Sequence, residues 1–405
     1  MRGDAMSPHV LFVGGEDHDL RIPFLLALQR HGLRVSAAGT GNSAPFARAG
    51  LSYHPFSFAR SASPLADGRS LAQLAHLFNE VRPDLVQSFD TKPNILVPLA
   101  ARRTPSMKVV RTINGLGWLY SSNAPLALAL RPVYRALHRM AARWTTATVF
   151  QNSMDKAFFE QHRMDGDSLA RLIPGSGIDI DAFTRPAAAD PSLVALRKQF
   201  DLEGCEVVLT VTRLSRQKGI PTLLKAASLV HAARPSVRFL LVGPHEGEGR
   251  SAVSPAEIDV HSRYVIATGK RTDVPSLLAL ADVFAFPTEF REGVPRALLE
   301  AAFAGLPIVA TRMPGCTDVV EDGHTGLLVA PGAPEELAQA MLRLLADRPA
   351  GRAMGIRASE LVRREFSLDH TVARYKDLYE EILAATPGPR SPAVTVTRNG
   401  LPEAV

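Results

Sequence analysis

Short, continuous apolar segments recur along the whole chain and alternate with longer stretches that have the spacing of helices. These segments are rich in β-branched residues and show no alternation between apolar and polar side chains. The predicted strands are residues 9–15, 34–39, 85–90, 108–114 and 147–152, then 206–213, 237–243, 264–269, 283–288, 307–311 and 326–330. Such strands, separated by helices, are typical of an α/β protein whose parallel sheets are covered on both faces.

The pattern starts again after a Pro- and Ala-rich passage at 185–192, which is the best linker candidate. We therefore predict two doubly wound, Rossmann-like parallel-sheet domains at 1–185 and 186–385 that face each other across a cleft. Closing helices and a loose tail are predicted at 333–346, 367–385 and 386–405. Ligands of such sheets bind beyond the carboxyl ends of the strands, so the cleft is the predicted site.

The composition fits a folded protein of a reducing compartment. The 405 residues are 46% hydrophobic, which excludes a disordered chain, and two cysteines are too few for a disulfide framework. No stretch approaches about 18 uninterrupted apolar residues, the length of a membrane-spanning helix. The N-terminus lacks a cleavage signature and is typical of a first strand rather than a signal peptide, so we expect a cytoplasmic protein.

The net charge of +6 is unevenly distributed. Residues 1–185 contain 21 basic and 14 acidic residues (+7), and residues 186–405 contain 25 basic and 26 acidic ones (−1). Residues 101–150 contain eight basic residues and no acidic one. This asymmetry indicates an anionic surface or polymer near the N-terminal half. Nucleic acid is not expected, because the basic region lacks interleaved aromatic residues and a known binding module.

The segment 288–307, TEFREGVPRALLEAAFAGLP, combines two glutamates with the start of a helix. Pro295 suits a first helical turn, which places Glu292 and the two amides after it at the electropositive end of the helix. Carboxylate and N–H groups together can bind a hydroxyl-rich, phosphate-bearing ligand, and Glu300 can accept hydrogen bonds from a ribose. The alternative is an acidic helix start with one solvated glutamate; the adjoining EGVP and AGLP favour a binding site.

The segment 212–219, TRLSRQKG, follows a predicted strand and carries two cations beside its carboxyl end. Arg213 offers a planar fork and Lys218 a point charge, and together they can neutralise a diphosphate. The alternative is a solvated basic loop, which is the usual explanation when two cations occur without other binding residues.

Gly14 and Gly15 end the first predicted strand and allow the backbone to approach a phosphate or a sugar closely. The chain has neither G-x-G-x-x-G at this turn nor a P-loop, so a nicotinamide or P-loop nucleotide site is unsupported. Two D-x-D strings, at 17–19 and 179–181, are not assigned to a metal, because two cations and a helix N-terminus already serve the phosphates. No metal is expected.

The stretch 123–144 has the pattern of a basic amphipathic helix. Its predicted apolar face consists of Leu126, Leu130, Val133, Leu137, Met140 and Trp144, and a row of cations beside it consists of Arg131, Arg135, Arg139 and Arg143. Such a helix suits an anionic membrane surface. An ordinary domain helix with its apolar face on the sheet fits equally well, and both hold if the arginine row faces lipid headgroups.

Together these segments resemble the family 4 retaining glycosyltransferases, which have the GT-B fold of two Rossmann-like domains. The resemblance is specific over 206–346 and weaker in the N-terminal half, which is similar to the subgroup that extends lipid-linked glycans of capsule, O-antigen or exopolysaccharide. The matching segments are 213–219, 272–311 and 314–329, with VRPDLVQSFDTKPNILVPLAAR (81–102) and TINGLGW (112–118) in the N-terminal half.

The resemblance implies a nucleotide-sugar donor on the C-terminal domain and an acceptor held mainly by the N-terminal domain. Glu300 would hold the donor ribose, and Glu292 would hold the transferred sugar and its distal phosphate. The implied catalytic residues are Glu292, Arg213 and Lys218, the last two stabilising the departing diphosphate. The implied donor-binding residues are Gly15, Gly243, Arg271, Gly293, Val294, Pro295 and Glu300. No cofactor is implied.

One departure from the family concerns the residue that follows the strand at 108–113. Many relatives carry His-Gly there, with the histidine directed at the transferred sugar, whereas this chain has Asn114 and Gly115. Asparagine forms hydrogen bonds to a sugar but does not titrate near neutral pH. Asn114 is therefore assigned as an acceptor or sugar contact.

The expected activity is the retaining transfer of a sugar from a UDP-type donor to a lipid-linked or glycan acceptor, in bacterial surface polysaccharide biosynthesis. The expected location is peripheral, on the inner face of the cytoplasmic membrane. One alternative is a sugar-nucleotide 2-epimerase on the same fold, against which Asn114 counts. The other is a nucleotide-sugar-binding subunit without turnover, against which the intact motifs count.

Overall fold

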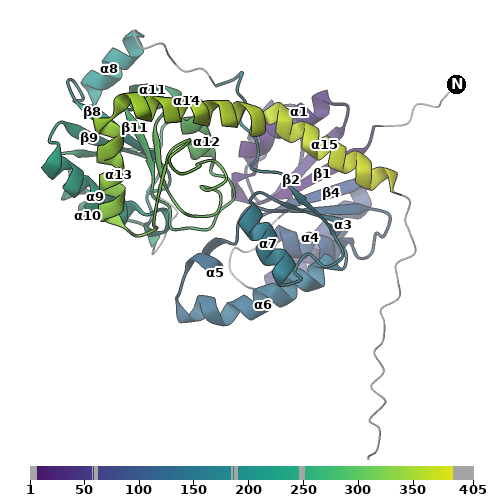
Figure 1. Cartoon of the computed structure of the whole chain (residues 1–405). Coiled ribbons are helices and arrows are strands. Elements are labelled where there is room, and N and C mark those ends of the chain that lie inside the picture. Colours follow the sequence, from purple (N-terminus) through teal and green to yellow (C-terminus); the bar gives the residue numbers. More distant parts are fainter. Residues whose placement is uncertain are drawn as a thin grey trace, which may run out of the picture.

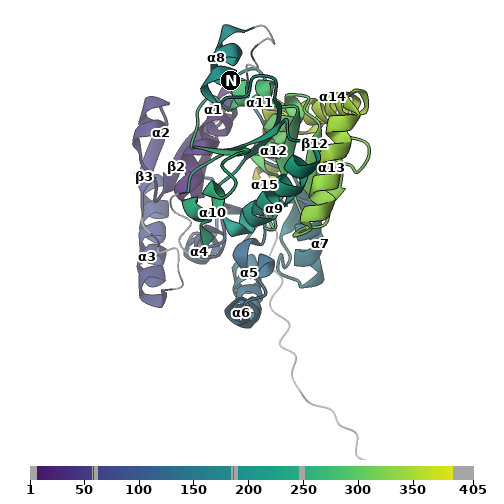
Figure 2. The same cartoon turned by 90° about the vertical axis from the view of Figure 1, so that its left-hand side faces the viewer.

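Two parallel sheets, each covered by helices on both faces, make up the computed structural model of the chain (Figure 1; Figure 2). The structure describes residues 7–56, 58, 63–183, 186, 190–245 and 251–385. The predicted domain boundary at 185 and the predicted tail at 386–405 lie outside the described residues.

The N-terminal sheet has the strand order β3-β2-β1-β4-β5-β6-β7 within the described residues. Its strands are β1 (His9–Gly14), β2 (Arg34–Gly39), β3 (Ser52–Pro55), β4 (Leu85–Phe89), β5 (Lys108–Ile113), β6 (Ala147–Phe150) and β7 (Leu169–Leu172). Its helices are η1 (Glu16–Arg21), α1 (Ile22–Arg30), α2 (Ala44–Arg48), α3 (Pro64–Val81), α4 (Pro93–Ala101), α5 (Gly117–Ser121), α6 (Pro125–Ala142) and α7 (Ser153–Gln161). The order reverses between β1 and β4, and this is the point where such sheets bind ligands.

The C-terminal sheet has the order β10-β9-β8-β11-β12-β13 within the described residues. Its strands are β8 (Glu206–Val211), β9 (Val237–Val242), β10 (Val265–Gly269), β11 (Val283–Phe286), β12 (Ile308–Thr311) and β13 (Leu327–Val329). Its helices are α8 (Pro191–Gln199), η2 (Arg216–Lys218), α9 (Ile220–Ala233), α10 (Pro255–Asp259), α11 (Val274–Leu280), α12 (Arg296–Phe303), α13 (Pro334–Ala346) and α14 (Arg348–Glu365).

Every strand predicted from the sequence is present, and two further strands, β3 and β7, were not predicted. Both extra strands lie at the edges of the N-terminal sheet. An edge strand faces solvent along one side and does not need a continuous apolar run, and β3 accordingly reads Ser-Tyr-His-Pro with no buried residue.

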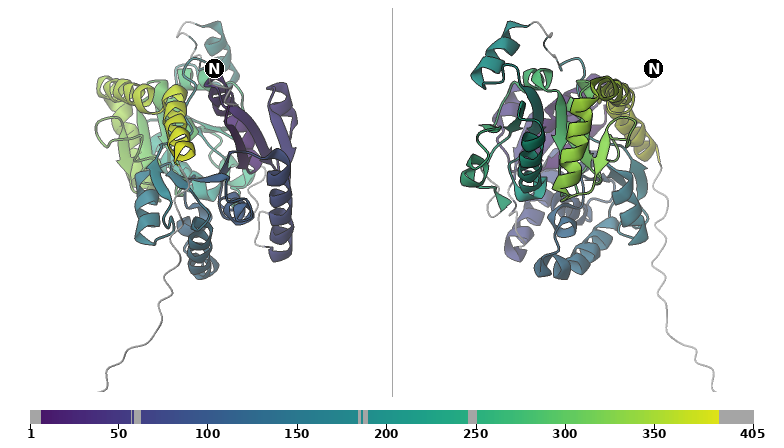
Figure 3. Two further views of the ribbon diagram at one scale, coloured as in Figure 1. Left: turned by 90° about the vertical axis from the view of Figure 1, so that its right-hand side faces the viewer. Right: turned by 60° about the vertical axis from the view of Figure 1, so that its left-hand side comes forward.

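The last helix, α15 (Leu368–Ala384), leaves the C-terminal domain and packs against α1 of the N-terminal one (Figure 1; Figure 3). Tyr375 and Tyr379 are buried in the same hydrophobic core as Phe24, and the rings of Tyr375 and Phe24 are 5.1 Å apart at their centroids. From the sequence, residues 367–385 are predicted to belong to the C-terminal domain. The side chains of this helix instead complete the N-terminal core.

We predict that Tyr375→Ala destabilises the N-terminal domain by about 3 kcal/mol, because it leaves a cavity in a packed aromatic core. Both tryptophans of the chain, Trp118 and Trp144, belong to this domain, so tryptophan fluorescence during urea unfolding monitors it selectively. Asp377→Ala, at an exposed position of the same helix, serves as the control and leaves the midpoint unchanged. An unchanged midpoint for Tyr375→Ala would contradict the assignment of α15 to this core.

Candidate active site

A cavity of about 330 Å³ follows the carboxyl ends of four neighbouring strands of the C-terminal sheet. Its lining includes most of the predicted catalytic and donor-binding residues, namely Arg213, Lys218, Gly243, Arg271, Glu292, Pro295 and Glu300. Lys270 and Arg296, which the sequence analysis did not select, also line it. The cavity therefore brings together residues that are up to 87 positions apart in the sequence, beside the ends of these strands.

The strand order sets the sequence of groups along the cavity. Arg271 follows β10, Gly243 follows β9, Arg213 follows β8 and Glu292 follows β11, and these four strands are adjacent in that order. At about 4.8 Å between strands, the groups span about 14 Å. An elongated ligand with a charged middle can therefore lie across the strand ends, with cations from two strands along it.

An ion pair between Lys218 and Glu292 lies at one end of the cavity. Nζ of Lys218 is 2.6 Å from Oε2 of Glu292, and Oγ1 of Thr288 donates a hydrogen bond of 3.2 Å to the other carboxylate oxygen. The Lys218 side chain is only 8% exposed and lies over the ring of Phe290. Both charges are thus held in place before any ligand binds, which favours electrostatic catalysis.

The residue after Lys218 explains why this cation is held so close to β11. Gly219 has φ 70°, and a Cβ at this position would lie 1.8 Å from the backbone oxygen of Pro287. Only glycine permits this close approach of the η2 turn to the loop after β11. The Q-K-G sequence therefore places Lys218 against Glu292 through backbone packing.

Glu300, on α12, also lines the cavity and pairs with Arg296 one turn earlier, at 2.8 Å. Arg271 forms a two-point contact with Asp273, which raises the pKa of the arginine and lowers that of the aspartate. Each predicted donor-binding charge therefore has a protein partner, and a ligand exchanges or shares these contacts when it binds.

The loop that carries Glu292 is in contact with the N-terminal domain. The N–H of Gly293 donates to the backbone oxygen of Asn114 at 2.6 Å, and the N–H of Gly117 donates to that of Arg291 at 3.1 Å. Gly115, with φ 113°, allows this approach, because a Cβ there would lie 2.6 Å from Cα of Glu292. The two domains therefore meet directly at Glu292, the glutamate predicted to be catalytic.

Three of the predicted donor-binding residues need correction. The amide of Gly293 is already used by Asn114, so it is not available to a phosphate. Val294 lines a separate cavity of about 160 Å³ together with Arg21. Pro295 is the N-cap of α12 and not a residue of its first turn, with extended ψ of 126°. The physical reason is the interdomain contact, which sequence periodicity does not reveal.

Gly15 and Asn114 lie on the N-terminal side and meet at Asp90 instead of lining the donor cavity. The N–H of Gly15 donates to Oδ2 of Asp90 at 3.0 Å, and Nδ2 of Asn114 donates to Oδ1 at 3.2 Å. The predicted donor contact through the Gly15 amide is therefore replaced by a contact within the protein. Asp90 itself was missed, although it ends a predicted strand.

A buried ion pair fixes the same loop from the other side. Oδ1 of Asp155, whose side chain is inaccessible, is 2.9 Å from Nη2 of Arg291. Asn152 donates to the second oxygen of Asp155 at 2.8 Å and to the backbone oxygen of Glu292 at 3.3 Å. Burial raises the pKa of Asp155, and the hydrogen bond from Asn152 and the charge of Arg291 oppose that rise. Neither partner was identified from the sequence.

Helix α6 buries a different face from the predicted one. The predicted apolar face includes Leu126 and Val133, which are 63% and 52% exposed. The buried residues of α6 are Ala127, Tyr134, His138, Ala141 and Ala142. The reason is Arg111 on β5, a fully buried cation that donates to the backbone oxygen of His138 at 3.2 Å. Burial lowers the pKa of Arg111 to about 10, and polar groups of α6 must face it.

The arginine row of α6 is also divided between roles. Arg131 donates to the backbone oxygens of Leu119 and Ser122, at 3.0 and 3.1 Å, so it caps the neighbouring α5. Arg139 donates to a backbone oxygen after α7 and, like Arg143, remains exposed. The exposed side of α6 thus combines large apolar side chains with these two cations.

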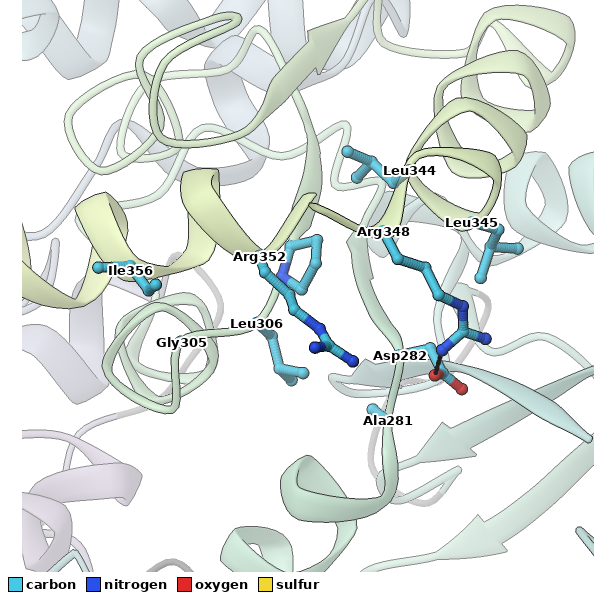
Figure 4. A pocket seen from close by; sticks show the side chains of 10 residues that line it. Ala281, Asp282, Gly305, Leu306, Leu344, Leu345, Arg348, Arg352 and Ile356 are labelled. Carbon is cyan, nitrogen blue, oxygen red and sulfur yellow. Dashed lines mark hydrogen bonds and ion pairs between the residues drawn. The ribbon is translucent and has the colours of Figure 1, made fainter. Parts of the chain in front are cut away.

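A second cavity, of about 410 Å³, lies between β11, β12 and the helices α13 and α14 (Figure 4). Arg348 and Arg352 point into it, and Arg348 is paired with Asp282 at 2.9 Å. Asp282 and Pro307 precede β11 and β12, so this cavity is at the amino ends of the strands. It is therefore not the ligand site of the sheet.

Among the described residues, no group of three or more His, Cys, Asp or Glu side chains is arranged for a metal ion. That the enzyme needs no metal stays a prediction.

The fold and the site define a GT-B glycosyltransferase, and comparisons with known proteins agree. Family models described as "Glycosyl transferases group 1" and "Glycosyl transferase 4-like domain" match residues 205–347 and 24–160. A GDP-mannose-dependent alpha-(1-6)-phosphatidylinositol monomannoside mannosyltransferase of Mycobacterium tuberculosis is 30% identical over 297 residues, which are 70% of this chain and 72% of that protein. The chain belongs to the family 4 glycosyltransferases.

Two further similarities concern the lipid-linked relatives and the fold. The UDP-Gal:alpha-D-GlcNAc-diphosphoundecaprenol alpha-1,3-galactosyltransferase of Escherichia coli is 27% identical over 330 residues, which are 80% of this chain and 82% of that protein. The crystal structure of Anabaena HepE in complex with UDP and glucose has a TM-score of 0.73 at 19% identity and covers 92% of this chain and 99% of that one. The latter supports the GT-B fold.

We predict that Asp155→Asn and Arg291→Gln each lower the free energy of unfolding by about 3 kcal/mol, because each removes one partner of an ion pair whose carboxylate is fully buried. The double variant should lose much less than the sum of the two, and urea unfolding of all four proteins gives the coupling energy. Lys156→Gln, on the exposed side of α7, is the control. Strictly additive losses would show that the two side chains do not stabilise each other.

Proposed function

We propose that this glycosyltransferase moves a sugar from a UDP-type nucleotide-sugar to a lipid-linked acceptor, with retention of the anomeric configuration. The observation that carries the proposal is the cavity that Lys218 and Arg213 line together with Glu292 and Glu300. A nucleoside diphosphate-sugar carries the matching groups, with hydroxyls on its sugar and its ribose and anionic charge on its diphosphate.

In this arrangement the ribose lies at Glu300, the diphosphate at Arg213 and Lys218, and the sugar at Glu292. Negative charge develops on the leaving diphosphate in the transition state, and fixed cations stabilise it there. Lys218 is the stronger contributor, because its charge is almost fully desolvated, whereas Arg213 is exposed. The protein supplies charge and orientation, and no metal is required by this scheme.

Retention is proposed to proceed by departure of the diphosphate and entry of the acceptor hydroxyl from the same face. The bond between the anomeric carbon and the leaving oxygen breaks, the acceptor oxygen forms the new bond, and its proton passes to the departing phosphate. A covalent intermediate on Glu292 is disfavoured, because the 2.6 Å contact with Lys218 and the hydrogen bond from Thr288 lower the nucleophilicity of that carboxylate.

The proposed acceptor is a lipid-linked glycan of bacterial surface polysaccharide biosynthesis. The names of the Escherichia coli relative and of a Campylobacter jejuni relative that is 23% identical both specify a sugar on diphosphoundecaprenol. The basic N-terminal half supports an anionic partner of this kind. Within the described residues, no helix is both long and apolar enough to cross a membrane.

We place the enzyme peripherally on the inner face of the cytoplasmic membrane, with α6 as the contact. This helix and α5 lie at the lower edge of the molecule in Figure 1 and Figure 2. Exposed Leu126 and Val133, with Trp118 of α5 at 38% exposure, provide apolar groups for insertion. Arg139 and Arg143 provide charge for anionic headgroups.

The test of the activity is mass spectrometry of reactions that pair UDP-glucose, UDP-galactose, UDP-N-acetylglucosamine or GDP-mannose with a diphosphoundecaprenol-linked sugar. We expect transfer from a UDP-sugar, an α-configured product by NMR and no loss in EDTA. Transfer only from GDP-mannose would overturn the UDP assignment. An epimerised donor without transfer supports the 2-epimerase, and donor binding without turnover supports the binding subunit.

Lys218→Ala should lower kcat at least about 100-fold, the usual effect of removing one transition-state donor. Glu300→Ala should instead raise the KM for the donor, because a ribose contact is present in the ground state as well. Lys225→Ala and Glu335→Ala, at exposed positions outside the cavity, are the matched controls. Unchanged kinetics for both cavity variants would refute the site.

For the membrane contact, the double variant Leu126→Gln and Val133→Gln should reduce sedimentation with phosphatidylglycerol-containing liposomes at least about tenfold, since each apolar side chain contributes about 1.5–3 kcal/mol on burial. Val194→Gln, at an equally exposed position of α8, is the control. Arg139→Gln with Arg143→Gln should weaken binding only at low salt. Equal binding by all variants would leave α6 an ordinary domain helix.

A further inference from the structure

Asp90 has an unusual backbone conformation at the point where the N-terminal sheet reverses its strand order. It follows β4, between the loops that follow β1 and β5, and its φ is 71°. Left-handed backbone is uncommon outside glycine, and aspartate and asparagine adopt it more readily than other residues. The crevice at this point of an open sheet is where ligands bind. Asp90 therefore combines an uncommon backbone conformation with a position at which open sheets bind ligands.

Three groups of the protein orient the Asp90 carboxylate. Gly15 N–H and Asn114 Nδ2 each donate to one of its oxygens, at 3.0 and 3.2 Å, and Nη2 of Arg21 lies 3.7 Å away. The side chain nevertheless remains 41% exposed. A carboxylate has about four acceptor positions, so these contacts leave capacity for a ligand. Asp90 is thus fixed in direction and still accessible.

Asn114 connects this carboxylate to the donor side of the cleft. Its side chain binds Asp90, and its backbone oxygen accepts the N–H of Gly293, the residue after Glu292. Asp90 and Glu292 belong to different domains, and Asn114 links them through its two hydrogen bonds, to Asp90 and to Gly293. A sugar at Glu292 has Asp90 on the side from which the N-terminal domain presents its ligand.

The charge of Asp90 restricts what it can bind. An ionised carboxylate accepts hydrogen bonds and donates none, so its partner must carry O–H or N–H groups. The diphosphate of the donor or of a lipid-linked acceptor carries like charge and is repelled. The group that fits is a neutral, hydroxyl-bearing sugar ring.

We propose that Asp90 binds a hydroxyl of the acceptor sugar and thereby orients the attacking oxygen towards the donor. Gly15 and Asn114 act through Asp90 as positioning residues. The inference rests on the proposed function and adds the element that recognises the acceptor. It also explains how an N-terminal domain with Asn114 in place of a titrating side chain contributes to the reaction: it orients the hydroxyl, and the proton leaves with the phosphate.

Asp90→Asn is the discriminating variant, because asparagine tolerates left-handed backbone and keeps the shape of the side chain. We expect kcat/KM for the acceptor to fall about 10- to 100-fold, the range for loss of a hydrogen bond to a charged group. Donor affinity by calorimetry and donor hydrolysis without acceptor should stay within about twofold of the wild type. Asp84→Asn, at the opposite end of β4, is the matched control and should leave all three values unchanged.

Deoxy analogues of the acceptor sugar identify the hydroxyl. The analogue that lacks it should react slowly with the wild type and no more slowly with Asp90→Asn. Loss of donor affinity in Asp90→Asn would assign the carboxylate to the donor sugar, and unchanged acceptor kinetics would exclude it from recognition; either result overturns the proposal. Absence of transfer by the wild type with every donor and acceptor refutes the proposed function instead.

Discussion

The active site depends on one close backbone contact between the two domains. The hydrogen bond from Gly293 to Asn114, at 2.6 Å, and the packing of Gly115 on Glu292 bring two loops together without side chains between them. This contact determines where the glutamate lies, and Lys218 and Asp155 then hold the two flanks of its loop. On the other side of the contact, the side chain of Asn114 donates a hydrogen bond to Asp90 and so fixes its position. The proposed donor and acceptor groups are therefore positioned by the same few backbone atoms.

How much of this structure can be predicted from the sequence depends on how far apart in the sequence the interacting residues lie. Buried parallel strands carry a local signal, because both faces need apolar residues, and all such strands were predicted. The edge strands β3 and β7 lack that signal because neither contains a buried residue. Most residues selected from the sequence as donor contacts line one cavity, because they follow adjacent strands within one domain. The contacts of Gly15 with Asp90 and of Arg291 with Asp155 join residues 75 and 136 positions apart, and no local pattern encodes them.

The basic character of residues 101–150 illustrates the difference between charge in a sequence and charge available to a partner. Arg111 is fully buried, and Arg131 is committed to backbone oxygens of α5. The buried guanidinium of Arg111 also requires polar neighbours, and this requirement turns Tyr134 and His138 inward and leaves Leu126 outside. The buried Arg111 thus determines which face of α6 packs on the sheet and which of its side chains are exposed to solvent.

The path of the last helix gives the two domains a common pivot. The chain crosses between them near Ile178 and again near Ser367, and these two crossings pair as a parallel bridge, with hydrogen bonds of 2.9 and 2.8 Å from Ile178 to Phe366 and from Leu368 to Ile178. Two connections at one place leave rotation about that place as the easiest relative motion. A rotation about this bridge separates Asn114 from Gly293 and leaves the core around α15 intact, with no loss of secondary structure.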